Sequence, residues 1–421
     1  MGRAFWILAL GRFISALGDG FFFPFTALYL TRVHGVPPEQ VGIAMSIAGF
    51  ASLLGRLPGG GLTDRYGFKT VAVVGLLGAG SAIIAAGIAP TVWLFVVAYS
   101  LESIFTWGSF PALMHGAALM VAADRREEAF SILNVLSNAG ISLGPILGTY
   151  LVARDYSLIF WLDGLTFFAF ALLVAFGIPA LREEANQPGR QGGRGTERPP
   201  VLSVYLPPLS ARRFWRVALS TALVAVAYSQ LGSSLPINIE RQFGSVAWYG
   251  LLWTLNGLMI AVLQFPGTRW LENRDRRQRM AVGALLHGAG VLVILAALEL
   301  HQPAGVFVAM TVITLGEILY APLPPTEFAE SAPPGLGGRY QGAGSIANGV
   351  GWAVGPLVGG LLLGRMGPVA LWGSMAACAL TAALVLQPFS QQASRSRSIG
   401  DQERDESQRG QSRSVQCEED P

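Results

Sequence analysis

The stretch GGGLTDRYGFKT, from Gly59 to Thr70, lies between two segments that are apolar enough to cross a membrane. It carries Asp64, Arg65 and Lys69, whose charges are costly to place in hydrocarbon and must stay in water. A charged loop between two long apolar segments is typical of a chain that crosses a bilayer and returns. The stretch therefore predicts a membrane-spanning helix on each side of it.

The composition of the whole chain agrees with a membrane protein. Of its 421 residues, 52% are hydrophobic and only 13% are charged, and the mean hydropathy is +0.47. A soluble domain usually carries about 25% charged residues. The net charge of +3 is small and the basic residues are dispersed through connecting segments, so the sequence gives no indication of nucleic-acid binding.

Twelve segments are long and apolar enough for helices that cross a hydrocarbon layer about 30 Å thick. They cover 5–30, 41–62, 70–89, 91–118, 128–152, 157–180, 214–236, 248–266, 280–298, 305–328, 340–363 and 368–389. We therefore expect an all-α membrane protein with twelve transmembrane helices.

The basic residues predict which side of the membrane holds the chain ends. An even number of crossings puts both termini on one side, and Lys and Arg are enriched in cytoplasmic connections. Of the 29 basic residues, only Arg32, Arg154, Arg241 and Arg365 fall in the odd-numbered connections. We therefore expect both termini in the cytoplasm, in a multi-pass protein of the cell (inner or plasma) membrane.

A polar stretch divides the chain into two halves. Residues 182–213 are too polar and too rich in Gly and Pro to form a hydrophobic core. They predict a cytoplasmic linker between six-helix bundles at 1–181 and 214–390, and residues 391–421 predict a disordered cytoplasmic tail.

The two halves also resemble each other. GISLGPILG at 140–148 matches GWAVGPLVGG at 351–360, in the fifth predicted helix of each half. Tandem repeats of this kind are related by an axis along the membrane normal in many transporters. The match predicts two pseudo-symmetric bundles.

The pattern G-x-L-x-D-R-x-G-x-K in the opening stretch includes Gly60, Asp64, Arg65, Gly67 and Lys69. It resembles the signature loop between helices 2 and 3 of the major facilitator superfamily of secondary transporters. The resemblance implies the major facilitator fold, and it gives Asp64 and Arg65 the role of a cytoplasmic latch that breaks when the two bundles reorient. The alternative is an ordinary positively charged turn.

A second motif, G-x-x-x-G-P-x-x-G, consists of Gly140, Gly144, Pro145 and Gly148 in the fifth predicted helix. Its glycines allow another helix to come close, and its proline removes a backbone hydrogen bond. The motif resembles one associated with the antiporter branch of the superfamily, and LGDGFFFPF at 17–25 resembles a pattern of twelve-helix drug exporters. The alternative is a generic packing face, which the similar glycines of the second half favour.

Three carboxylates are predicted at membrane depth: Asp19, Glu317 and Glu102. A charge at the bilayer centre costs about 3 kcal/mol on insertion scales, so such residues are candidates for function. We expect one of them to carry a proton whose binding alternates with that of the substrate. The alternatives for Asp19 are a carboxylate neutralised by Arg12 or one that simply lies near a water-filled cavity. For the other two the alternative is a hydrogen-bonded structural group.

Aromatic side chains dominate the helices that the resemblance places around a central cavity. Such walls suit hydrophobic and often cationic compounds, through stacking and cation–π contacts. The alternative for each ring is a lipid-facing position. The predicted cavity residues are Phe21, Phe22, Phe105, Trp107, Asn138, Tyr228, Trp253 and Tyr320.

These features predict a secondary active transporter for the proton-coupled efflux of small hydrophobic or amphipathic compounds, such as drugs, by alternating access. The sequence has no P-loop and no metal-ligand spacing, so we expect the proton gradient as energy source, with no cofactor and no metal. We expect no enzymatic activity, and a functional monomer whose partners are the lipid bilayer, the substrate and protons. The alternatives are a symporter or uniporter for a sugar, organic acid or other small metabolite, and, from a different class, a membrane enzyme or receptor.

Overall fold

The computed structural model describes residues 1–122, 125–179, 211–244, 247–271, 273–332 and 337–386. Every regular element in these ranges is helical, and no strand occurs in them. Most of the predicted linker and the whole predicted tail lie outside the described residues. Of the linker, only residues 211–213 are described, and Arg212 and Arg213 already belong to a helix.

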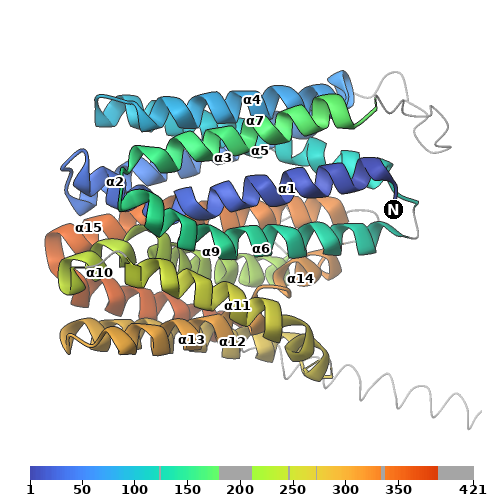
Figure 1. The fold of residues 1–421 in the computed structure, drawn as a ribbon. Helices are drawn as coiled ribbons and strands as arrows, with labels where there is room; N and C mark the ends of the chain where they lie inside the picture. Colours follow the sequence, from blue (N-terminus) through green and yellow to red (C-terminus); the bar gives the residue numbers. More distant parts are fainter. Residues whose placement is uncertain (123–124, 180–210, 245–246, 272, 333–336, 387–421) are drawn as a thin grey trace, which may run out of the picture.

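The first half of the chain forms the helices in the upper part of Figure 1. α1, η1 and α2 follow one another without a loop and form one membrane-length segment. The elements are α1 (Arg3–Phe22), η1 (Phe23–Phe25), α2 (Thr26–Arg32), α3 (Pro38–Tyr66), α4 (Phe68–Gly87), α5 (Val92–Leu119), α6 (Arg126–Val152) and α7 (Ser157–Gly177).

The second half forms the helices in the lower part of Figure 1. α9 with α10, and α13 with α14, again form single membrane-length segments. The elements are α9 (Arg212–Ser233), α10 (Leu235–Phe243), α11 (Ala247–Trp270), α12 (Arg276–Glu299), α13 (Pro303–Tyr320), α14 (Pro324–Glu330) and α15 (Gly337–Leu386).

The described residues contain 10 helical segments that are long and apolar enough to cross a membrane. The last of them, α15, is two helices joined at Gly367, whose φ of 84° and ψ of −178° break the helix. α3 adds a helix of 29 residues, although it carries Arg56 and Arg65. The all-α membrane architecture is therefore confirmed, and the helices are consistent with twelve crossings.

The turn between the second and third predicted helices is much shorter than expected. α3 continues to Tyr66 and α4 begins at Phe68, so most of the charged stretch is helical. The break is Gly67, whose φ of 79° is easily adopted only by glycine. The prediction of a loop over residues 59–70 was wrong because polar residues beyond the lipid can remain helical, and hydropathy does not detect this.

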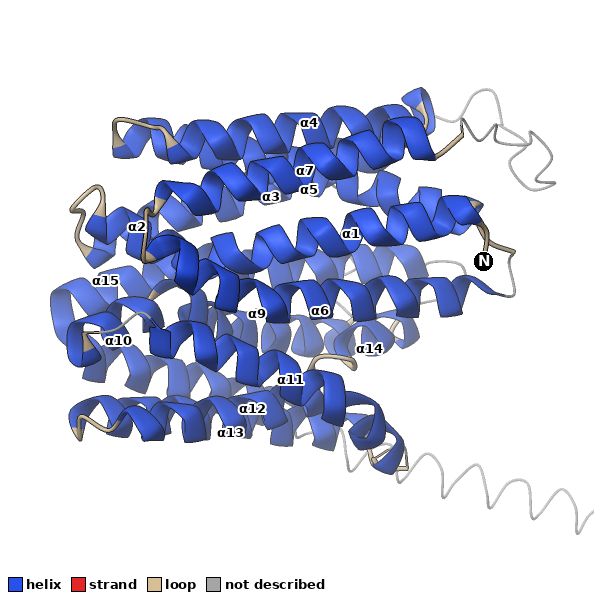
Figure 2. Ribbon diagram, viewed as in Figure 1, coloured by secondary structure: helices blue, strands red, loops and turns tan. Residues whose placement is uncertain are grey.

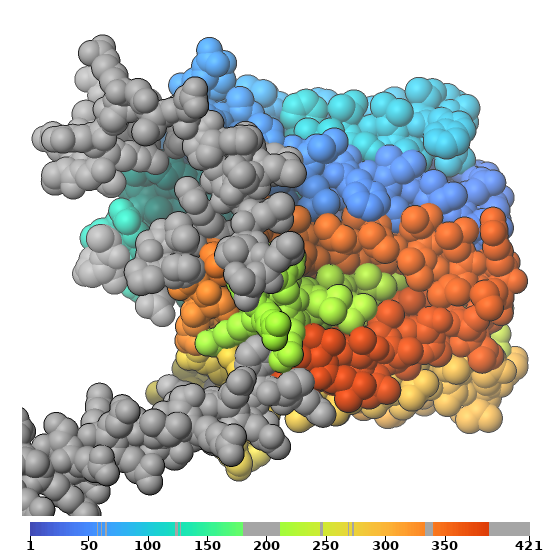
Figure 3. Space-filling view, turned by 180° about the vertical axis from the view of Figure 1, so that it is seen from behind, coloured from blue at the N-terminus to red at the C-terminus, as the bar shows by residue number. Residues whose placement is uncertain are grey.

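Each half packs mainly within itself, and two pairs of long helices make most of the contacts between the halves. α1 packs against α6 and α7, and α5 against α3 and α4; in the second half α15 packs against α9 and α12, and α13 against α11 and α12. Between the halves, α3 packs along α15 and α6 along α11. Figure 3 shows α3 in blue and α15 in orange side by side.

The helices run roughly parallel, so the bundle has two ends. α2 and α10 lie at one of them, the α2/α10 end, whereas α14 and the N-terminus lie toward the other, the α14 end (Figure 2). At the α2/α10 end the halves meet closely, because a Cβ atom on Gly42 would lie 2.2 Å from the carbonyl oxygen of Pro356. Arg32 of α2 also forms an ion pair with Glu240 of α10.

The glycine motifs of the two halves make equivalent contacts. A Cβ atom on Gly144 of α6 would lie 2.5 Å from the Cα atom of Gly20 in α1. A Cβ atom on Gly355 of α15 would lie 3.0 Å from the carbonyl oxygen of Val226 in α9. Small residues at such contacts allow two backbones to approach closely. The repeat in the sequence thus corresponds to a repeated helix pair in the fold.

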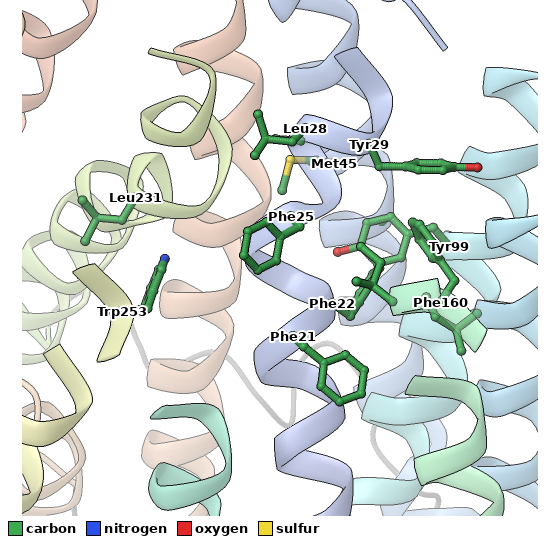
Figure 4. Packing of buried hydrophobic residues seen from close by; sticks show 14 of the residues in the cluster. Phe21, Phe22, Phe25, Leu28, Tyr29, Met45, Tyr99, Phe160, Leu231 and Trp253 are labelled. Carbon is green, nitrogen blue, oxygen red and sulfur yellow. The ribbon is translucent and has the colours of Figure 1, made fainter. Parts of the chain in front are cut away.

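An aromatic cluster fills the first half near α2 (Figure 4). The ring of Phe22 contacts those of Tyr99 and Phe160 edge to face, with centroids 5.5 and 5.3 Å away. Tyr29 lies 4.4 Å from Phe160, measured between centroids. Such contacts add to the free energy gained by burying the rings. The cluster ties α1, α2, α5 and α7 together.

Candidate functional site: a cavity beside Glu317

A cavity of about 420 Å³ lies within the second half of the molecule. Its wall comes from α9, α12, α13, α14 and the first turns of α15, and it includes Tyr228, His287, Glu317, Tyr320, Ser345 and Trp352. We refer to it as the Glu317 cavity. Its volume is within the range of known small-molecule sites.

Three helices position the carboxylate of Glu317. The Tyr228 hydroxyl from α9 donates a hydrogen bond to Oε2 at 3.0 Å, and the Asn256 amide from α11 donates to the same oxygen at 2.9 Å. The Asn256 amide also reaches the Thr314 hydroxyl at 3.0 Å, one turn before Glu317 on α13. Since both donors act on one oxygen, the carboxyl group is held in a defined orientation.

Aromatic rings form much of the remaining wall. The Tyr228 ring lies 5.9 Å from the rings of both Trp352 and His287, and Tyr320 lies 6.5 Å from His287, measured between centroids. The Nδ1 atom of His287 faces the carbonyl oxygen of Gly283 at 2.8 Å. The wall therefore combines flat apolar surfaces with a few polar groups, as ligand sites usually do.

The acids of the first half lie apart from this cavity. Asp19 on α1 is 3.7 Å from the Arg12 guanidinium, and its side chain is 33% exposed. Glu102 is buried and accepts hydrogen bonds from Thr106 at 2.7 Å and Ser103 at 3.2 Å. Asp163 of α7 is also buried, within electrostatic range of both Asp19 and Glu102. Thus the first half holds an acidic group of its own, and only Glu317 lines the cavity.

The predicted cavity residues divide between the Glu317 cavity and other places. Tyr228 and Tyr320 line it, and Trp253 is buried next to Tyr228, at 6.4 Å between ring centroids. Phe105 packs against α4, where a Cβ atom on Gly78 would meet its ring. Asn138 is exposed.

The other predicted aromatic residues lie in the first half. Phe21 and Phe22 are buried in its core, and Phe22 belongs to the cluster of Figure 4. Trp107 of α5 lies beneath the guanidinium of Arg56. None of these three lines the Glu317 cavity.

The motif at the end of α3 is described in part. Lys69 donates a hydrogen bond from Nζ to the carbonyl oxygen of Ile178 at 2.6 Å, and Arg65 lies over the Tyr66 ring. The side chain of Asp64 and the surroundings of Gly60 lie outside what the structure describes. The latch role of Asp64 and Arg65 therefore stays a prediction.

The motif of the fifth helix, in contrast, is fully described. Gly140, Gly144 and Gly148 of α6 all face α1, where Cβ atoms would meet backbone atoms at 2.9 Å or less. Pro145 lies within α6. Its carbonyl oxygen accepts a hydrogen bond from Thr149 at 2.9 Å. The motif thus sets the contact between α1 and α6, whatever further role it has.

Sequence reasoning missed two groups of charged residues. One is Arg56, which contacts Trp107 on α5 and Ser345 on α15. An arginine inside an apolar segment is a signal that could have identified it. The other is Glu327 with its two arginines, Arg213 and Arg277, which only the fold brings together.

The family model described as Major Facilitator Superfamily matches residues 8–356 and 217–405. The chain belongs to the Major Facilitator Superfamily. Superfamily relatives include the MFS-type transporter YttB of Bacillus subtilis, 28% identical over 384 residues, which cover 88% of this chain and 91% of YttB. Multidrug resistance protein MdtH of Salmonella typhimurium is 25% identical over 363 residues, which cover 86% of each chain.

Solved superfamily structures have the same fold. The crystal structure of peptide transporter POT in complex with sulfate has a TM-score of 0.78 at 18% identity, over 94% of this chain and 96% of that one. Nucleoside transporter NupG has a TM-score of 0.73 at 11% identity, over 91% and 98%. The protein is therefore a multi-pass membrane transporter and not an enzyme.

Proposed function

We propose that the protein exports small hydrophobic or amphipathic compounds in exchange for protons. The observation that carries the proposal is Glu317, a carboxylate with two hydrogen-bond donors in the wall of an aromatic cavity. A carboxylate in such a place can bind either a proton or a polar part of a substrate. The similarity to a relative named as a multidrug resistance protein supports export of drug-like compounds.

The arrangement of the halves fits one step of alternating access. With both termini in the cytoplasm, as the basic residues predict, the closely packed α2/α10 end faces outward. The exposed lining residues Gln341 and Ser345 belong to the first turns of α15, which lie toward the α14 end. The Glu317 cavity would then receive substrate from the cytoplasm. In this proposal the protein lies in the plasma membrane and works as a monomer.

In the proposed cycle, a proton from the outside binds Glu317 or Asp19 and displaces the substrate outward. The transporter then reorients more easily with a neutral carboxyl group, because a charge at membrane depth costs about 3 kcal/mol. The proton leaves to the cytoplasm, and the ionised group is ready for the next substrate. Glu102 is the third candidate for this role.

The test is transport into proteoliposomes under an imposed pH gradient, with a panel of fluorescent dyes and antibiotics. We expect Glu317→Gln or Asp19→Asn to accumulate the compound at a rate about tenfold or more below that of the wild type. A tenfold lower rate corresponds to an activation free energy higher by roughly 1.4 kcal/mol. Glu299→Gln, an exposed carboxylate at the end of α12, is the matched control and should transport normally. Accumulation that survives both substitutions would reject these proton sites.

A further inference from the structure

Arg56 of α3 lies where the backbones of α3 and α5 approach each other closely. A Cβ atom on Gly55 would lie 2.4 Å from the carbonyl oxygen of Ile104, and one on Gly108 would lie 3.4 Å from the carbonyl oxygen of Gly55. The two glycines therefore bring the backbones together next to Arg56 and Trp107. As a result the guanidinium carbon of Arg56 lies only 3.6 Å from the centroid of the Trp107 ring.

The positive charge of Arg56 has no anionic partner in the described part of the chain. No carboxylate there lies within 4 Å of the guanidinium, whose Nη1 donates only to the neutral Ser345 hydroxyl, at 3.1 Å. The Nε atom is buried and has no hydrogen-bond partner among the residues that the structure describes. Stacking on tryptophan stabilises a cation and leaves its N–H groups free to bind an acidic group.

Arg56 is linked to the Glu317 cavity through Ser345. Ser345, its hydrogen-bond partner on α15, lines that cavity, and Asn348 lines it one turn further on. Seven residues of helix separate Ser345 from Trp352, which corresponds to about 10 Å along the axis. A molecule with an acidic group at Arg56 could therefore place its body beside Trp352 and Tyr228.

We propose that Arg56 is an anion-binding subsite, so that the transporter prefers amphipathic compounds that carry an acidic group. The inference rests on the proposed function, because it takes the Glu317 cavity as the substrate site. It adds the substrate class: an acidic group at Arg56 and an aromatic or apolar body in the cavity. The acidic group would bind at α3, whereas the Glu317 carboxylate belongs to α13.

The test is equilibrium binding to the purified protein in nanodiscs of phosphatidylcholine, without a pH gradient. The probes are benzoate, 4-phenylbenzoate and naphthalene-2-acetate, each compared with its primary amide by ligand-dependent thermal shift. We expect at least one acid to bind the wild type ten times more tightly than its amide. Arg56→Gln should reduce this ratio to about one and leave amide binding unchanged, which shows that the variant is folded.

Two further variants separate charge from packing. Arg56→Lys keeps the charge and should retain a preference for the acid. Arg154→Gln removes another arginine that stacks on an aromatic ring, that of Tyr150 at 4.3 Å, far from the cavity, and should bind like the wild type. The proposal is overturned if no acid binds better than its amide, or if Arg56→Gln keeps the preference.

Two more comparisons show whether Arg56 binds substrates or lipid headgroups, and whether a negative result rejects the proposed function or the Arg56 subsite. Nanodiscs that contain phosphatidylglycerol should give the same preference; its loss would assign Arg56 to lipid headgroups and overturn the substrate role. An acid preference without transport driven by a pH gradient would reject the proposed function alone. Gradient-driven transport without an acid preference would reject the Arg56 subsite alone.

Discussion

Gly144 sets the distance between α1 and α6. Its added Cβ atom would lie 2.5 Å from Gly20 Cα and 2.7 Å from the Phe21 backbone nitrogen, and backbone cannot move aside as a flexible side chain can. We predict that Gly144→Ala destabilises the protein by about 1–3 kcal/mol, the usual cost of overpacking. The apparent melting temperature in detergent, read by fluorescence-detected gel filtration, should fall.

Gly373→Ala is the matched control for this prediction. It also adds a methyl group to a glycine in a membrane helix, but nothing lies within 4 Å of the new Cβ atom. Alanine has the higher helix propensity, so this variant should be as stable as the wild type or slightly more stable. Equal melting of the Gly144 and Gly373 variants would show that α1 and α6 do not touch as described.

At the residue scale, sequence spacing predicts contacts only along one helix. The glycines of α6 are four residues apart, so their common face could be predicted, and α1 does lie on it. The donors to Glu317 could not be predicted, because Tyr228 and Asn256 lie 89 and 61 residues away along the chain. The direction of Phe105, toward α4 and away from the cavity, likewise depends on how whole helices are rotated.

At the scale of elements, α14 is held in place by a buried carboxylate. Pro322 and Pro324 interrupt the helical hydrogen bonds between α13 and α14, which leaves α14 as a separate short helix. Glu327 on α14 is only 3% exposed, and it pairs with Arg213 of α9 at 3.1 Å and with Arg277 of α12 at 3.3 Å. α14 also lines the Glu317 cavity through Phe328.

We predict that Glu327→Gln destabilises the protein by about 1.5–3 kcal/mol, because it removes the charge-assisted hydrogen bonds that Arg213 and Arg277 donate to a buried carboxylate. The neighbouring Glu330→Gln is the control. Glu330 pairs with Arg213 and Arg276 but is 46% exposed, so its loss should cost about 1 kcal/mol or less. Thermal melting of both variants at low and high salt measures the difference. Similar decreases in melting temperature for the two variants would contradict the role of Glu327 in holding α14 in place.

The length of elements was predicted less well than their existence. Apolar composition located the helices, since about 20 apolar residues are needed to cross the membrane. It could not show that α3 continues to Tyr66, because helical residues beyond the lipid can be polar. Apolar composition also could not show that η1 separates α1 from α2, or that α9 ends and α10 begins within one membrane-length segment. Both are local backbone changes within apolar sequence.

At the scale of the whole molecule, an ion pair helps to close the α2/α10 end. Arg32 and Glu240 come from different halves, and their side chains are 58% and 10% exposed. Tyr156 lies beside them, where burial and then the Glu240 charge raise the pKa of its phenol. The phenol therefore stays neutral at physiological pH, and the ion pair is a charged contact between the halves that opening of this end must break.

We predict that Glu240→Gln weakens closure by about 1 kcal/mol, which corresponds to roughly a fivefold change in the ratio of open to closed molecules. Electron-paramagnetic-resonance distances between spin labels at the exposed Ile88 and Leu300 measure this ratio, in a variant without Cys378 and Cys417. The distance distribution should shift to longer values.

Two variants control this prediction. The exchanged pair, Arg32→Glu with Glu240→Arg, should restore the wild-type distribution. Arg241→Gln, an exposed neighbour without an ion pair in the described part of the chain, should leave it unchanged. An unaltered distribution in Glu240→Gln would mean that the ion pair does not contribute to closure.

In the proposed exchange, substrate and protons cross the membrane in opposite directions. The exchange is tested by adding an exported compound to everted membrane vesicles whose lumen respiration has made acidic, while a fluorescent dye reports the pH of the lumen. We expect the lumen to become less acidic when the compound is added, because each transported molecule is exchanged for protons. Vesicles that contain Glu317→Gln should show no such change. A lumen pH that stays constant while the compound accumulates, or that falls further, would contradict the exchange.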